Sequence, residues 1–211
     1  MEDVLEVYQR PYDPDYPVVC FDETRKELHD SPRCGFPAQP GQVARQDYEY
    51  ERNGSASLLL WYEPLAGPCG VSVREQHTGA NVAEVLAYLS DTVYPSAKKI
   101  VLVSDNLSTH KVHFLYDKFT PEEARRLSER FEWHYTPEHG SWLNIAECAL
   151  SVLSRQCLSR RIADIDTLRQ EVAAWEAERN QKPHTVNWQF RAEDARIKLK
   201  RLYPIQSDKT S

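Results

Sequence analysis

The pattern of apolar and polar positions predicts a series of strands followed by helices. Short apolar or alternating runs that favour β-strands stand at residues 18–22, 47–51, 57–62, 71–76, 99–104 and 131–135. Between the second and third of these runs, Asn53-Gly54 is the strongest hairpin-turn dipeptide in the chain. The first strands are therefore expected to form an antiparallel meander.

Apolar residues three and four positions apart predict helices at 81–93, 121–130, 142–157, 165–180 and 192–202. Pro121 suits a first helical turn, and Asp164 suits an N-cap. The helix at 81–93 leads into the strand at 99–104, as a crossover connection does. In the segment 142–157, Glu147 lies on the flank of an apolar stripe, so we expect it to border the core. The whole pattern predicts a mixed α/β sheet.

Composition narrows the class of protein. With 211 residues, 41 % hydrophobic and 27 % charged, the chain is typical of one globular domain. No apolar run approaches the roughly 18 residues of a membrane helix, and the acidic start is unlike a secretory leader, so a cytoplasmic protein without membrane contact is expected. Five cysteines without a CxxC pair argue against a zinc ribbon or a disulfide framework. A net charge of -6 argues against a stand-alone nucleic-acid binder.

Two predicted strands are followed by acids that can share one site. Asp22 ends the strand at 18–22, Asp105 follows the strand at 99–104, and Glu147 lies in a predicted helix. Carboxylates at the ends of buried strands converge at one edge of a sheet, and such oxygen ligands suit Mg²⁺. Taken singly, each acid could equally be a strand-end cap or a solvated helical residue. Together they predict metal-dependent phosphoryl chemistry.

Five segments in this order resemble bacterial insertion-sequence transposases of the mariner-like DDE superfamily, the six-thirty family. They are Phe-Asp-Glu at 21–23, Gln-Pro-Gly-Gln at 39–42, Asp-Tyr-Glu-Tyr-Glu-Arg-Asn-Gly at 47–54, Val-Ser-Asp-Asn-Leu-Ser-Thr-His at 103–110 and His-Gly-Ser-Trp-Leu-Asn-Ile-Ala-Glu at 139–147. The similarity extends from about residue 17 to residue 204. One such segment would be weak, but five in sequence are specific.

The resemblance implies an RNase H-like fold, a mixed sheet of an antiparallel meander plus parallel strands, flanked by helices. It also implies that Asp22, Asp105 and Glu147 are the catalytic and metal-binding acids. Two Mg²⁺ ions, which Mn²⁺ can replace, would then be held with Asp22 bridging both, Asp105 on one and Glu147 on the other. The implied reactions are DNA strand cleavage and strand transfer at insertion-sequence ends.

Family members also carry an N-terminal helix-turn-helix region that recognises the element ends, and residues 1–16 cannot form one. We therefore expect a helix remnant and linker at 1–16, the catalytic domain at 17–204 and a disordered tail at 205–211. The implied partners are inverted-repeat and target DNA, a second copy in a homodimeric active complex, and a helix-turn-helix region that is upstream or on a separate chain.

Four polar residues near the acids could orient them or contact DNA, although ordinary loop and cap roles are equally open: Asn106, His110, His139 and Asn144. Two other functions remain as alternatives. A truncated transposase fragment could act as a non-catalytic regulatory partner. A haloacid-dehalogenase-type phosphatase is suggested by Phe21-Asp22-Glu23, but its second aspartate is replaced by Thr24.

Overall fold

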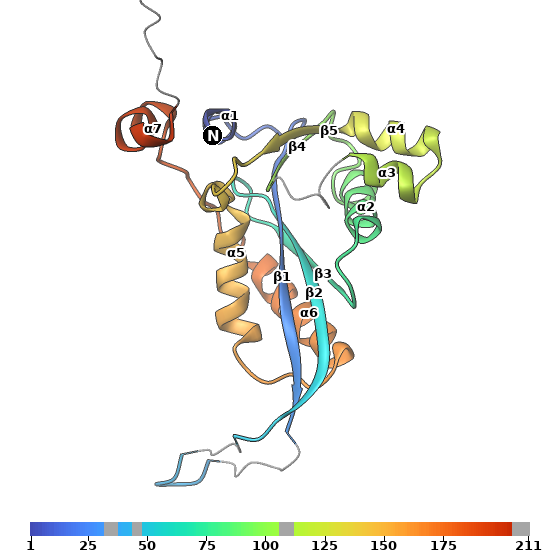
Figure 1. Ribbon diagram of the computed structural model, residues 1–211, viewed down its shortest axis with the longest axis vertical. Coiled ribbons are helices and arrows are strands. Elements are labelled where there is room, and N and C mark those ends of the chain that lie inside the picture. The colour runs from blue at the N-terminus through green and yellow to red at the C-terminus, as the bar shows by residue number, and fades with distance from the viewer. Residues whose placement is uncertain (32–37, 44–47, 106–111, 204–211) are drawn as a thin grey trace, which may run out of the picture.

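The computed structural model of the protein describes residues 1–31, 38–43, 48–105 and 112–203. It contains a five-stranded sheet with the strand order β3-β2-β1-β4-β5 (Figure 1). The strands are β1 (Val18–Asp30), β2 (Glu51–Tyr62), β3 (Cys69–Arg74), β4 (Ile100–Ser104) and β5 (Phe131–Tyr135). β1, β2 and β3 form an antiparallel meander, whereas β4 is parallel to both β1 and β5. The predicted mixed sheet is confirmed.

Helices pack on both faces of this sheet. They are α1 (Glu2–Val7), α2 (Gly79–Tyr88), α3 (His113–Lys118), α4 (Pro121–Arg130), α5 (Ala146–Leu153), α6 (Ile165–Gln181) and α7 (Ala192–Lys198). π-helical turns η1 (Leu89–Val93) and η4 (Ser154–Leu158) extend α2 and α5, and short 3₁₀ turns form η3 (Ser141–Leu143) and η5 (Lys200–Leu202). Figure 1 shows α5 and α6 on one side of the sheet and α2, α3 and α4 on the other.

The central strands are apolar on both sides because both faces are covered. On β1, Val18 and Cys20 belong to the core under α5 and α6, and Val19 and Phe21 belong to the core under α2 and α4. β4 divides its side chains in the same way. A strand buried on two faces is a continuous apolar run without alternation. This is the pattern from which the sequence predicted strands at 18–22 and 99–104.

The predicted hairpin turn at Asn53-Gly54 is wrong, because both residues lie inside β2. The pairing of β1 with β2 shifts at this point, so that the two residues together oppose Leu28 as a β-bulge. Gly54 has φ +90°, a left-handed conformation that glycine adopts at low cost. Bulges and tight turns use the same dipeptide, so the local signal could not separate them.

Other boundaries also differ from the prediction. β2 begins only at Glu51, while residues 48–50 are not in a strand and 44–47 fall outside the described residues. The helix predicted from residue 142 begins at Ala146, after η3, and the last predicted helix ends at Lys198. α3 was not predicted. These ends are set by contacts between distant segments, which local periodicity does not contain.

The N-terminal helix is part of the packed core. Val4, Leu5 and Val7 of α1 are almost completely buried and belong to the same apolar cluster as α5. Its polar side is held by Glu2, whose carboxylate accepts two hydrogen bonds from Arg196 of α7. The expected tail at 205–211 lies outside the described residues. Among the described helices, none has the length and apolar character needed to cross a membrane.

The bulge gives a direct test of backbone strain. Gly54→Ala should lower the free energy of unfolding by about 1–2 kcal/mol, because an L-residue is strained at φ +90°. A Cβ at this position would meet no atom within 4 Å, so the loss would not come from a clash. Urea unfolding monitored by circular dichroism measures it. The exposed Glu51→Ala variant is the control and should change stability by less than about 0.5 kcal/mol; an equal effect in both variants would contradict the assignment.

Candidate active site

The register of β1 and β4 relates Asp22 to Asp105, at the point where β4 ends beside β1. The two strands are parallel and Cys20 pairs with Val103. Continuing this register by two residues brings Asp22 level with Asp105. Because side chains alternate along a strand, both acids share the side of the sheet on which Cys20 and Val103 are buried, the side covered by α5. The expectation that Asp22 ends a strand is wrong, because β1 continues to Asp30 and Asp22 pairs with Leu60 of β2. Only Asp105 directly follows the end of its strand, since β4 ends at Ser104.

Asp22 is buried and held by two hydrogen bonds. Its side chain belongs to a residue only 7 % exposed. The backbone N–H of Glu23 donates to Oδ1 at 2.8 Å, and the Nδ2 amide of Asn144 donates to Oδ2 at 3.2 Å. The same amide group donates to the carbonyl oxygen of Phe21 at 2.9 Å. Asn144 therefore fixes both the backbone and the carboxylate at the end of the buried part of β1.

Asn144 also fixes the start of α5. Its Oδ1 accepts from the backbone N–H of Ala146 at 3.2 Å, and its carbonyl accepts from the N–H of Glu147 at 3.1 Å. These bonds satisfy donors that the first helical turn leaves without partners. One side chain thus connects the strand that carries Asp22 to the helix that carries Glu147.

Glu147 lies in the first turn of α5 and is exposed. This corrects the expectation that it borders the core. The predicted apolar stripe is buried, since Ala146, Leu150 and Leu153 are each at most 6 % exposed. Glu147 follows Ala146 by about 100° around α5 and lies outside that buried stripe.

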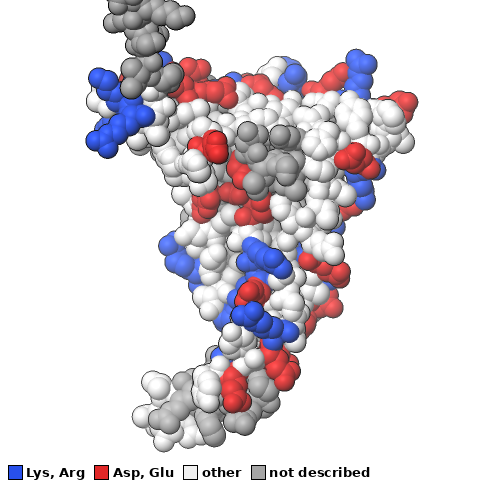
Figure 2. Space-filling view, in the orientation of Figure 1, with Lys and Arg blue, Asp and Glu red and all other residues white. Residues whose placement is uncertain are grey.

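The electrostatics of Asp22 link it to both other acids. The pKa of its carboxyl is raised from the ordinary 3.8 to about 7, chiefly by burial and also by the negative charges of Glu147, Glu23 and Asp105, while the hydrogen bond from the Glu23 N–H opposes the shift. Asp22 therefore lies within the field of both acids that the sequence grouped with it. Figure 2 shows acidic side chains gathered in the middle of the displayed face, beside a segment drawn in grey.

The acids do not form a closed metal cage in this arrangement. Among the described residues, no three His, Cys, Asp or Glu side chains come close enough to hold a metal ion. The donor set nevertheless fits Mg²⁺ or Mn²⁺ chemically, because it consists of carboxylate oxygens. Burial is the main cause of the raised pKa of Asp22, and the charges of the neighbouring acids add to it; a bound cation would offset both.

Of the four polar residues predicted near the acids, the structure describes two, and only one of these contacts an acid. Asn144 touches Asp22, as described above. His139 has φ 59° and a side chain that is 93 % exposed; its ion-pair partner among the described residues is Glu138, at 3.9 Å. The structure does not bring it to the acids. Asn106 and His110 lie outside the described residues, so their predicted contacts stay predictions.

Tyr8 supports the site in a way that the sequence did not reveal. Its buried hydroxyl donates to the carbonyl of Leu143 at 2.7 Å and accepts from the backbone N–H of Ile145 at 3.3 Å. It thus holds the residues on both sides of Asn144. Burial raises the pKa of Tyr8 well above its ordinary value, so the hydroxyl keeps its proton. Since 135 positions separate Tyr8 from Leu143, no local pattern could have found the contact.

The sequence of this domain matches a known family over most of its length. The model of the DDE superfamily endonucleases matches residues 17–169, a range that includes Asp22, Asp105 and Glu147. The chain belongs to the DDE superfamily endonucleases. This confirms the resemblance from which the site was predicted. No curated protein matches the chain significantly.

Solved structures agree with this DDE fold. One is a Mos1 mariner paired end complex with Mn (17 % identity, TM-score 0.54, covering 82 % of this chain and 52 % of that one). Another is a pre-cleavage Mos1 transpososome, with 15 % identity, a TM-score of 0.55, and coverage of 82 % of this chain and 52 % of that one. A third is a simian T-cell lymphotropic virus intasome in complex with PP2A regulatory subunit B56 gamma. Its identity is 13 %, its TM-score is 0.51, and the match covers 96 % of this chain and 61 % of that one. At such identities the likeness shows the fold, and the chain spans about half the length of the two mariner proteins.

The pKa of Asp22 predicts an unusual dependence of stability on pH. Between its unfolded pKa near 3.8 and its folded pKa of about 7, the folded chain keeps a proton that the unfolded chain releases. The wild-type protein therefore loses stability at this residue as pH rises through that window. Asp22→Asn cannot ionise, so its stability relative to wild type should rise by roughly 2–4 kcal/mol between about pH 4 and about pH 8.

Urea unfolding in EDTA at the two pH values measures this difference. The loss of the Asn144 hydrogen bond to Oδ2 shifts the variant's stability at every pH and cancels from the comparison. Asp166→Asn, at an exposed position of α6, serves as the matched control. A stability difference between Asp22→Asn and wild type that stays constant with pH would contradict a buried, raised Asp22.

Proposed function

We propose that this DDE superfamily endonuclease cleaves DNA at the ends of an insertion sequence and joins the released 3′ ends to target DNA. The observation that carries the proposal is the buried Asp22 inside β1, whose pKa is raised by burial and also by the charges of Glu147 and Asp105. Three carboxylates that destabilise one another are costly to the fold unless a cation offsets their charge. Membership of the DDE superfamily endonucleases supports the same conclusion.

Asp22, Asp105 and Glu147 would hold two divalent cations, Mg²⁺ or Mn²⁺. Such ions, when bound, supply an activated oxygen nucleophile and stabilise the leaving oxygen of a phosphodiester. The chain's own part is to keep the ligands in place and to give up a proton. Asn144 and the Glu23 N–H fix the Asp22 carboxylate. Because its pKa is about 7, this carboxyl is about half protonated at neutral pH and must lose that proton to bind a cation.

The proposed partners follow from what the similar structures are described as. The Mos1 structures are a paired end complex, a pre-cleavage transpososome and a strand transfer complex. By analogy we assign this chain inverted-repeat ends and target DNA as substrates and a homodimer as the active form. Recognition of the end sequence is assigned to a helix-turn-helix region, either upstream or on a separate chain.

Cation binding should stabilise the fold independently of any activity. At 100 times the dissociation constant, Mg²⁺ or Mn²⁺ should add about 2.7 kcal/mol and raise the melting temperature. Asp22→Asn and Glu147→Gln should lose most of that increase, because each removes one ligand. Differential scanning fluorimetry in MgCl₂, against NaCl of equal ionic strength, measures the effect. A wild-type melting temperature that responds identically to both salts would count against the three-acid cation site.

Removal of any one acid should abolish DNA cleavage. Asp105→Asn and Glu147→Gln keep the size of the side chain but remove its charge, so nicking of inverted-repeat DNA in Mn²⁺ should fall to background. Glu129→Gln, which breaks an exposed ion pair with Arg125 on α4, is the matched control and should retain activity. Wild-type protein no more active than Asp105→Asn would favour the regulatory alternative over catalysis.

A further inference from the structure

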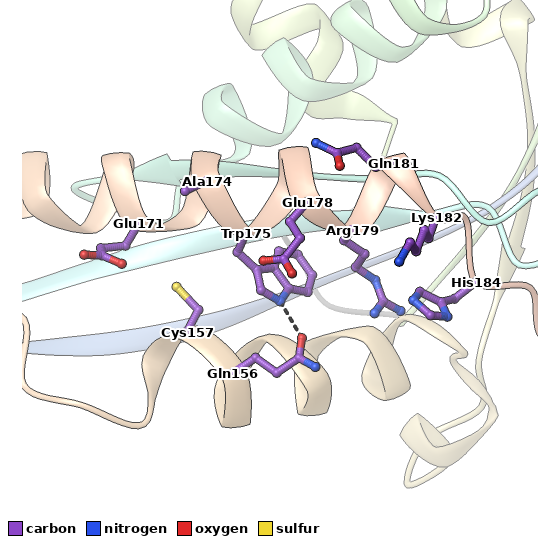
Figure 3. Close-up of a pocket in the computed structure, with 10 residues that line it drawn as sticks. All are labelled: Gln156, Cys157, Glu171, Ala174, Trp175, Glu178, Arg179, Gln181, Lys182 and His184. Atoms are coloured by element: carbon purple, nitrogen blue, oxygen red, sulfur yellow. Dashed lines mark hydrogen bonds between the residues drawn. The ribbon is translucent and has the colours of Figure 1, made fainter.

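A pocket of about 620 Å³ lies between η4 and the C-terminal half of α6, apart from the acidic residues of the candidate active site (Figure 3). Trp175 of α6 forms its wall, and the indole Nε1–H donates to Oε1 of Gln156 at 2.8 Å. Seven of the ten residues that line the pocket have charged or polar side chains: Gln156, Glu171, Glu178, Arg179, Gln181, Lys182 and His184. This composition points to a charged ligand and not to an apolar one.

Three basic side chains gather at one end of this pocket, and we call Arg179, Lys182 and His184 the cationic corner. Figure 3 shows them side by side where α6 ends. The Arg179 guanidinium lies 5.4 Å from the centre of the Trp175 ring. Its Nε atom is buried and has no hydrogen-bond acceptor in the described part of the chain. Within the described residues, the ion pairs of α6 involve Asp166, Arg169 and Glu171, and none involves a residue of the cationic corner.

The cationic corner is held in position before any ligand arrives. The hydroxyl of Tyr62 on β2 donates to the carbonyl of His184, and the N–H of Val186 donates to the carbonyl of Pro64 at 2.8 Å. Gly67 packs so closely that a Cβ there would lie 2.8 Å from the backbone nitrogen of His184. A segment fixed to the sheet in this way loses little conformational entropy on binding, which favours affinity.

We propose that the cationic corner binds a phosphate group, with Arg179 and Lys182 as its main contacts. The guanidinium group of Arg179 and the ammonium group of Lys182 line the same pocket, and both donate charge-assisted hydrogen bonds of the kind that a phosphate oxygen accepts. The planar fork of arginine matches phosphate geometry, and lysine adds a point charge. A DNA phosphodiester and a small phosphate compound share this chemistry, so both are sources to be tested.

Two acids also line the pocket, and their charges determine whether a substitution should strengthen or weaken phosphate binding. Glu171 is neutralised by an ion pair with Arg160. Glu178 has no ion pair in the described part of the chain, and Figure 3 shows its carboxylate beside Trp175 within the pocket. A bound phosphate would be repelled by Glu178. Removing that charge should therefore strengthen binding, whereas removing a basic charge of the corner should weaken it.

The indole N–H of Trp175 gives a local signal for binding. The resonance is assigned in a ¹H–¹⁵N spectrum recorded in EDTA, as the peak that Trp175→Phe lacks. Inorganic phosphate should shift this resonance until the site is saturated, whereas NaCl of equal ionic strength should not shift it. Arg179→Gln and Lys182→Gln should each weaken binding at least about tenfold, and Glu178→Gln should tighten it. Arg169→Gln, on the same helix but outside the pocket, is the matched control. Lys182 is exposed, so its variant remains informative if Arg179→Gln lowers stability.

A short DNA duplex, titrated in the same way, separates the two sources. A shift with the duplex that phosphate competes away supports the site and assigns it to the DNA backbone. A shift with phosphate alone supports the site and assigns it to a small phosphate compound. No shift with either, or equal binding by wild type and Lys182→Gln, overturns the proposal. Since no cleavage is measured, either result leaves the proposed endonuclease function to its own test.

Discussion

The side chain of Asn144 is the connection on which the candidate site depends. Its amide donates to the Phe21 carbonyl and the Asp22 carboxylate, while its oxygen accepts from the first turn of α5. The residue is 1 % exposed, and a buried amide left without partners would be costly. The strand that carries Asp22 and the helix that carries Glu147 are therefore fixed to each other by bonds that the fold strongly resists losing. Tyr8 reinforces them from α1.

The burial of Asp22 conflicts with its charge, and this conflict is informative. An exposed aspartate would ionise at neutral pH without lowering the stability of the fold. Asp22 is instead buried, and the negative charges of other acids act on it. Folds retain such strain mainly where function requires it. The backbone N–H of Glu23 and the Asn144 amide offset only part of the cost. Under the proposed function, a bound cation would offset the rest of this cost.

A structural feature could be predicted from the sequence only where residues close together in the chain determine it. The β4 run, the helix α4 behind Pro121 and the Asp164 N-cap of α6 were readable because each is encoded within a few residues. The bulge at Gly54 was mistaken for a turn, since its identity depends on the partner strand. Within the site, strand-end logic grouped Asp22 with Asp105, but the break before α5 and the role of Tyr8 rest on contacts across more than 100 positions.

The charge distribution implies an order in which the proposed site would bind its cation and its nucleic acid. Under the proposed function, the acidic site of a chain with net charge -6 would repel DNA until the charge of its acids is offset. Cation binding would offset that charge and would also require the Asp22 proton to leave. Even then the chain remains acidic overall, and affinity for a polyanion has to come from basic groups that are not already paired. If the phosphate proposed for the cationic corner belongs to DNA, Arg179 and Lys182 at the end of α6 would supply such groups. A chain built in this way would bind its cation first and its nucleic acid second.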